Sequence, residues 1–270
     1  MATVEKPRRR PQRVPVALLV PAVLGLAFLV LPMVGLLVRA PWTTLPERLT
    51  EPGVLTALGL SLQTATIATV VCVILGVPLA WLLARVEFPG RRVVRALVTV
   101  PLVLPPVVGG VALLLVLGRR GLVGAWLDRT FGVTLPFTTT GVVVAEAFVA
   151  MPFLIIAVEG ALRGADARFE EAAATLGAGR LVTFTHVTLP LVAPGIAAGA
   201  VLCWARALGE FGATITFAGN YPGITQTMPL AVYQTLEGGD LDGAIVLSLL
   251  LLLVSVGILA TLRDKWISSR

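Results

Sequence analysis

The chain has 270 residues, of which 57% are hydrophobic and only 13% charged, and its formal net charge is +6. A soluble domain has about 25% charged residues, so this composition excludes a mainly soluble protein and leaves room for one membrane domain. The positive charges are scattered over short loops and form no basic stripe, which argues against a nucleic-acid partner.

Six stretches are apolar enough to cross a bilayer, which takes about 20 residues of helix. The first follows a basic segment at residues 1–13, and its 25 uncharged residues exceed the apolar core of a signal peptide. We therefore expect it to be a retained span. Cys72 and Cys203 lie within the apolar stretches and have neither metal-binding nor disulfide spacing, so we expect both cysteines to be small buried residues. The six predicted spans are residues 14–38, 60–83, 96–118, 140–158, 189–208 and 243–262.

The distribution of Lys and Arg predicts how the chain sits in the membrane. Fifteen of the 21 lie in the two tails or follow the second and fourth spans, whereas five lie in the remaining loops. Cytoplasmic segments carry the excess of positive charge. The sequence thus predicts an all-α membrane protein of six transmembrane helices with both termini cytoplasmic. Its parts would be a tail at residues 1–13, a first helix at 14–38, a five-helix domain at 55–262 and a tail at 263–270.

The third span contains the sequence LVLPPVVGGVALLL at residues 102–115. Proline frees backbone carbonyls of a membrane helix, which is tolerated where neighbouring helices or water satisfy them. This pattern favours a bent helix in a packed, water-lined bundle. Small residues that serve only close helix packing are the alternative.

A polar segment at about residues 164–190 separates the fourth and fifth spans and contains EAAATLGAGRLVTFTHVTLPLVAPG. Residues 166–175 favour a helix, which Gly177 and Gly179 can end. Residues 180–188 favour a second short helix with Phe184 and Val187 on one side. The pattern predicts a helix–turn–helix on the cytoplasmic face, which can brace the bundle or dock a partner.

This segment resembles the EAA loop of permeases from ATP-binding-cassette importers. The resemblance is carried by Glu171-Ala172-Ala173, by Gly177 and by Leu189-Pro190 at the family's spacing. It implies the type I importer permease fold, in which the loop inserts as a coupling helix into a groove on a separate ATPase subunit. A purely structural brace is the alternative. The coupling residues that it implies are Glu171, Ala172, Ala173, Gly177, Phe184, Leu189 and Pro190.

Residues 205–233 resemble the corresponding segment of permeases for molybdate and, less closely, for sulfate, and LGRRG at residues 117–121 points the same way. The resemblance implies import of molybdate, and of tungstate by the same chemistry, with a sulfate or thiosulfate permease as the alternative. It also implies a homodimer in a bacterial or archaeal plasma membrane. A pair of ATPase subunits would use ATP and Mg inside, an oxyanion-binding protein would dock outside, and this chain itself would bind no cofactor or metal.

Polar side chains in and after the fifth span are candidates for a gate or an oxyanion path. A tetrahedral dianion needs positive charge and hydroxyl or amide donors that hold it loosely. The same loop can instead dock a binding protein or cap the bundle. The candidates are Arg206, Glu210, Thr214, Thr216, Asn220, Thr225, Gln226 and Thr227, together with Glu146 of the fourth span.

The helical rise predicts how the charges inside the spans pair. At about 1.5 Å per residue, Arg206 lies roughly 25 Å from the inner boundary and Glu146 roughly 9 Å from the outer one. Arg206 can therefore pair with Glu146 or, at a spacing of four residues, with Glu210. Glu159 and Arg163 form a similar pair near the inner boundary.

Two other classes of function fit the sequence less well. The chain has one histidine, His186, and lacks HExxH, GxSxG and Walker motifs, which argues against an enzyme or an ATPase. An ion-coupled secondary transporter needs ionisable sites at the membrane midplane, where these spans are largely uncharged. That reading also leaves the EAA-like loop without a purpose.

Overall fold

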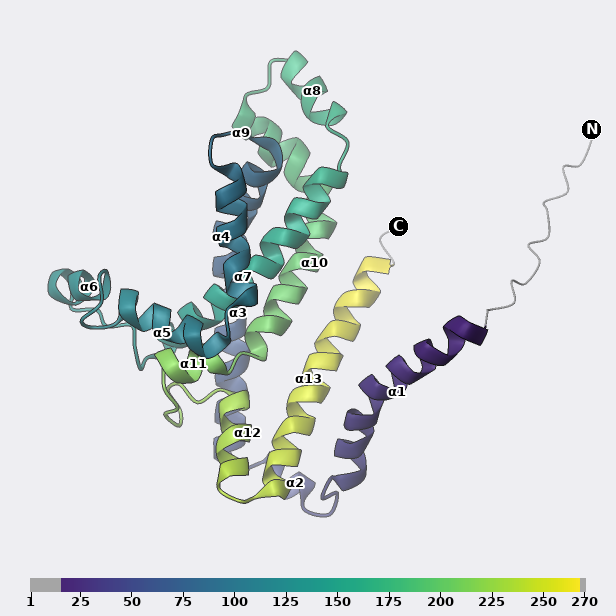
Figure 1. The fold of residues 1–270 in the computed structure, drawn as a ribbon, viewed down its shortest axis with the longest axis vertical. Helices are drawn as coiled ribbons and strands as arrows, with labels where there is room; N and C mark the ends of the chain where they lie inside the picture. Colours follow the sequence, from purple (N-terminus) through teal and green to yellow (C-terminus); the bar gives the residue numbers. More distant parts are fainter. Residues whose placement is uncertain (1–15, 268–270) are drawn as a thin grey trace, which may run out of the picture.

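A computed structural model of the chain describes residues 16–267, and every regular element in that range is a helix (Figure 1). The long helices are α1 (Val16–Arg39), α3 (Pro52–Arg85), α7 (Thr139–Gly164), α10 (Leu189–Leu208) and α13 (Leu241–Ile267). The shorter elements are α2 (Leu45–Leu49), α4 (Arg91–Val103), α5 (Pro106–Leu117), α6 (Gly124–Phe131), α8 (Arg168–Thr175), α9 (Arg180–Thr183), the π-helical turn η1 (Phe184–Thr188), α11 (Gly212–Phe217) and α12 (Met228–Glu237).

The core is formed by α3, α7 and α10, which pack against one another. Small residues bring them together: a Cβ added at Gly76 of α3 or at Gly199 of α10 would stand 3.1 Å from a methyl carbon of Leu154 in α7. Such small residues let membrane helices approach closely. Cys72 and Cys203 are fully buried in this core, as predicted.

Five helices are long and apolar enough to span a membrane, and a broken pair raises the number to six within the described residues. The second span begins earlier than predicted, because α3 starts at Pro52 and runs for 34 residues, roughly 51 Å at 1.5 Å per residue. The fifth is longer too, because α9, η1 and α10 continue as one helix of 29 residues. Helix α1 leans away from the bundle and contacts α13 through Leu36 and Ala40 (Figure 1).

The third predicted span is not one bent helix. Helices α4 and α5 separate at Leu104 and Pro105, and the pair is bent by 118°. Proline lacks a backbone N–H and disfavours helical conformation in the preceding residue, and both Leu104 and Pro105 adopt ψ of 131°. As a result α4 runs along the bundle, whereas α5 leaves it sideways toward α6 (Figure 1).

The two ends of the bundle differ in what they carry. The α8 end holds α8 and α9, and the opposite end, called here the α12 end, holds α2 and α12 (Figure 1). The start of α1 and the end of α13 both point toward the α8 end. The predicted tail at 1–13 lies outside the described residues, and residues 263–267 of the other tail continue α13.

Candidate functional site

The segment between α7 and α10 folds as the predicted helix–turn–helix. Helix α8 is followed by Gly177, whose φ of +84° is a left-handed conformation that glycine adopts without strain. The N–H of Ala178 donates to the carbonyl of Ala173 at 3.0 Å, which closes the helix end. The chain then reverses into α9.

Most side chains of helix α8 face outward. None of them is buried, and Glu171 and Ala172 are exposed. Four large apolar side chains of the same segment are also exposed: Phe169 at 57%, Leu176 at 89%, Leu181 at 75% and Val182 at 51%. None of these four was predicted as a docking residue, although large apolar residues in a short polar segment are a signal for a docking surface. The segment thus offers an apolar surface with room for close approach at Ala172.

Phe184, Leu189 and Pro190 lie at the root of the segment. Phe184 meets Trp81 of α3 edge to face, with ring centroids 5.6 Å apart, and both Phe184 and Leu189 pack on the core. Pro190 has no N–H for the helical ladder, and the π-helical turn immediately before it accommodates that loss. Phe184 therefore anchors the segment to the bundle and does not face outward.

Ion pairs tie the α8 end together more extensively than predicted. The predicted pair of Glu159 and Arg163 is confirmed, with 2.6 Å between Oε1 and Nη2. Arg95 of α4 reaches the same oxygen at 2.6 Å, and its guanidinium also donates to the carbonyl of Leu83 at 3.0 Å. The sequence analysis missed Arg95 because it lies 64 positions from Glu159, too far for a local spacing rule.

At the α12 end, Arg206 pairs with Glu210 and not with Glu146. Arg206 Nη2 lies 2.6 Å from Glu210 Oε2, and the other oxygen of Glu210 accepts from the N–H of Ala213 at 2.8 Å. Glu210 thereby caps the start of α11. Glu146 forms no ion pair within the described range, so the alternative pairing is wrong. It accepts a hydrogen bond of 2.9 Å from Thr64 of α3, and it is 1% exposed.

Three of the other candidate path residues, Asn220, Thr225 and Gln226, form hydrogen bonds within the segment between α11 and α12 or to α12 itself. Thr225 accepts a hydrogen bond from the N–H of Tyr221, and both Asn220 and Gln226 donate to the side-chain oxygen of Gln234. Thr214, Thr225 and Thr227 are buried, and Thr216 donates to the carbonyl of Gly212. In the part of the chain that the structure describes, the hydroxyls of Thr214 and Thr227 have no hydrogen-bond partner.

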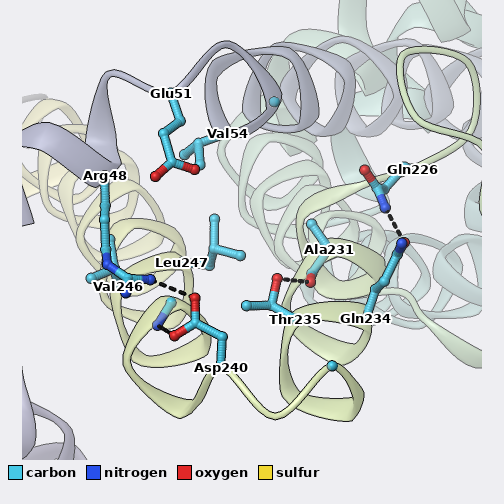
Figure 2. A pocket seen from close by; sticks show the side chains of 13 residues that line it. Arg48, Glu51, Val54, Gln226, Ala231, Gln234, Thr235, Asp240, Val246 and Leu247 are labelled. Carbon is cyan, nitrogen blue, oxygen red and sulfur yellow. Dashed lines mark hydrogen bonds and ion pairs between the residues drawn. The ribbon is translucent and has the colours of Figure 1, made fainter.

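A polar cavity of about 390 Å³ opens at the same end, between α2, α3, α12 and the start of α13 (Figure 2). Of the predicted residues it includes only Gln226. Arg48 and Asp240 meet at one side of it, with 2.6 Å between Nη1 and Oδ2. The hydrogen bond from Arg48, supported by the N–H of Gly243, lowers the pKa of Asp240, and the same contact raises the pKa of Arg48.

Comparisons with known proteins agree with this architecture. Residues 76–270 match the family described as binding-protein-dependent transport system inner membrane component. The chain is 48% identical over 235 residues to the molybdenum transport system permease protein ModB of Mycobacterium bovis, covering 87% of this chain and 88% of that protein. It is 34% identical over 247 residues to a probable sulfate transport system permease protein, cysT, of Nephroselmis olivacea, covering 90% and 86%.

The fold is also found among solved structures. A bacterial ABC transporter involved in the import of the acidic polysaccharide alginate superposes with a TM-score of 0.77 and 19% identity, covering 94% of each chain. At that identity the likeness concerns the fold alone, and the fold is that of ABC importer permeases.

Proposed function

The chain belongs to the family of inner membrane components of binding-protein-dependent transport systems, and from this premise we propose that it is the membrane-spanning subunit of an ATP-driven importer of molybdate. One observation carries the choice of cargo: the identity to a permease named for molybdenum transport is higher than to one named for sulfate transport. Tungstate, a dianion of nearly the same size and charge, would use the same route.

The working transporter would be a homodimer of this chain with two separate ATPase subunits. ATP and Mg would be bound and used there, so this chain would be the non-catalytic subunit. The charge count supports placing the α8 end in the cytoplasm, where the ATPase subunits would dock. An oxyanion-binding protein would deliver its cargo at the α12 end.

The segment from α8 to η1 would be the coupling element. The exposure of Glu171 and Ala172, with Ala173 half-buried beside them, supports docking of α8 into a groove on the ATPase. Gly177 would allow the reversal into α9, while Phe184, Leu189 and Pro190 would fix the root. ATP binding would draw the two coupling elements together and turn the path outward, and hydrolysis would reset it.

The buried polar residues at the α12 end would form the outer gate in its closed state. Glu146, Glu210, Thr214, Thr225 and Thr227 are buried. This burial supports a role as a gate and argues against a role as permanent ligands of the anion. Arg206, Asn220 and Gln226 would be the remaining gate residues, with Arg206 positioned by Glu210.

The experiment is uptake of labelled molybdate by cells that lack their own system and carry this chain with its ATPase and binding protein. We expect uptake that excess tungstate blocks and excess sulfate does not, and that vanadate inhibits because ATP hydrolysis drives it. Equal block by sulfate, or entry of sulfate in place of molybdate, would move the cargo to the sulfate class. Uptake driven by an ion gradient without ATP would refute the importer proposal itself.

A further inference from the structure

Helix α8 is held by little apolar packing. It buries no side chain. A cavity of about 400 Å³ lies between it, the end of α3 and η1, and its lining includes Trp81, Arg85, Glu170, Arg180 and Thr188. A helix that stands over a cavity needs some other contact to fix its position relative to the bundle.

That contact is the carboxylate of Glu170. Its Oε1 lies 3.3 Å from Arg85 Nε at the end of α3, and it accepts a hydrogen bond of 3.0 Å from the hydroxyl of Thr188 in η1. Arg85 also donates to the carbonyl of Ala165, which precedes α8, at 3.4 Å. The side chains of Arg85 and Glu170 are 18% and 20% exposed, so water screens this pair less than a surface pair.

We propose that Glu170 is the positioning residue through which movement of α8 reaches α3 and α10 at once. This inference rests on the proposed function, because it assumes that the ATPase moves α8. A single oxygen of Glu170 contacts α3 through Arg85 and contacts, through Thr188, the turn that continues into α10. Since α3 and α10 both pack in the core with α7, a displacement of this carboxylate acts on two core helices.

The root of the segment has its own attachment, which separates positioning from folding. The edge-to-face contact of Phe184 with Trp81 holds η1 against α3 without any atom of α8. Removal of the Glu170 carboxylate should therefore free α8 while η1 stays docked. Glu171, the adjacent carboxylate of the EAA pattern, forms no ion pair among residues 16–267 and is free to meet the ATPase.

The test is the number of ATP molecules hydrolysed per labelled molybdate imported, measured in proteoliposomes that contain the whole complex. We expect Glu170→Ala and Arg85→Met to raise this ratio by roughly fivefold to tenfold, while the ATPase subunits still co-purify in wild-type amount. Thr188→Val keeps every charge and should raise the ratio by about twofold. The reciprocal exchange Glu170→Arg with Arg85→Glu should bring the ratio back toward that of the wild type.

Glu87→Gln is the matched control, because Glu87 lines the same cavity and forms no ion pair in the described part of the chain; its ratio should not change. An unchanged ratio of ATP hydrolysed to molybdate imported in Arg85→Met would overturn the proposal. Loss of the ATPase subunits from the Glu170→Ala complex would also overturn it and would indicate that Glu170 contacts the ATPase directly. If Glu170→Ala does not fold, Arg85→Met and Thr188→Val decide. Absence of molybdate import in the wild type would instead refute the cargo, and the ratio is then measured with the oxyanion that the wild type imports.

Discussion

At the α8 end, helices α8 and α9 and the turn between them leave Phe169, Leu176, Leu181 and Val182 exposed, and α8 is tied to the bundle by an ion pair. At the α12 end, the short helices are built into the protein: α11 buries Gly212, Ala213, Thr214 and Phe217, and α12 buries Met228, Leu230 and Ala231. Both ends consist of short helices joined by glycine turns. They differ in whether apolar surface is kept inside the chain or presented outward.

This difference indicates how each end responds to change. Helix α8 buries no side chain, so we expect the α8 end to shift at low cost when a partner covers its apolar surface. Close packing and buried hydrogen bonds tolerate little displacement, so the α12 end should move as a unit. A substitution at the α8 end should therefore affect coupling, and one at the α12 end should affect stability.

The largest loss of stability should come from a substitution where α5 packs against α11. A Cβ at Gly110 would stand 2.6 Å from the Cβ of Thr216 and 2.9 Å from the carbonyl oxygen of Ala213. Gly110→Leu should lower the free energy of unfolding in detergent by about 3 kcal/mol, because a packed contact cannot take the added volume. Gly160→Leu in α7 is the control, since no atom lies within 4 Å of its added Cβ. Equal stability of the two variants would show that the α12 end is not closely packed.

At the α8 end, the largest effect should come from Gly177→Asp. Aspartate at a φ of +84° is strained, and its charge would lie beside the surface that docks. We expect normal insertion and an unfolding temperature close to that of the wild type, but uptake reduced by about tenfold or more. Uptake assays and membrane immunoblots measure the two effects separately. Normal uptake would remove the coupling role from this turn.

Much of the fold follows from the sequence, because the long spans are set by apolar length and the glycine turn after α8 by local chemistry. The pair of Arg206 and Glu210 was also predictable, since a spacing of four residues places both on one helix face. The break at Leu104 and Pro105 was predictable in position but not in angle. Consecutive prolines end a helix, whereas the direction of the next helix depends on what it packs against, here α11.

The contacts that sequence could not supply join residues far apart in the chain. Glu170 and Arg85 are 85 positions apart, and Arg48 and Asp240 are 192 apart. No spacing rule identifies such partners, and charged residues in loops are abundant. The burial of Thr214 and Thr227 was likewise hidden, because the pattern of hydroxyl residues after α10 suits an open path and a closed gate equally well.

Two variants compare the stability that a buried and an exposed ion pair contribute at the α12 end. Glu210 is 1% exposed, so Arg206→Gln would leave one oxygen of a buried carboxylate without its partner. We expect a loss of about 3 kcal/mol in the free energy of unfolding. Arg48→Gln removes a pair with the same 2.6 Å separation, but its side chains are 30% and 47% exposed, so water screens it and the loss should be much smaller. Chemical denaturation of both variants measures the difference in the loss of stability, and equal losses would contradict the prediction.

Transport by Arg206→Gln at the wild-type rate would also show that Arg206 makes no essential contact with the anion.

The smallest effect should be the pH dependence of the exposed pair. Arg48 and the N–H of Gly243 lower the pKa of Asp240 from its ordinary value of 3.8. A carboxyl whose pKa is lower in the folded state stabilises the fold fully above 3.8, and that contribution is lost as the pH falls through the folded-state pKa. The wild type should therefore exceed Asp240→Asn in unfolding temperature by a small margin at neutral pH, and the margin should vanish in acid below 3.8. In an Arg48→Gln background the margin should shrink at neutral pH, because the main cause of the lowered pKa is gone. A margin that grows on acidification would mean that Asp240 is stabilised in its protonated form, and the pair would then not hold α2 to the start of α13.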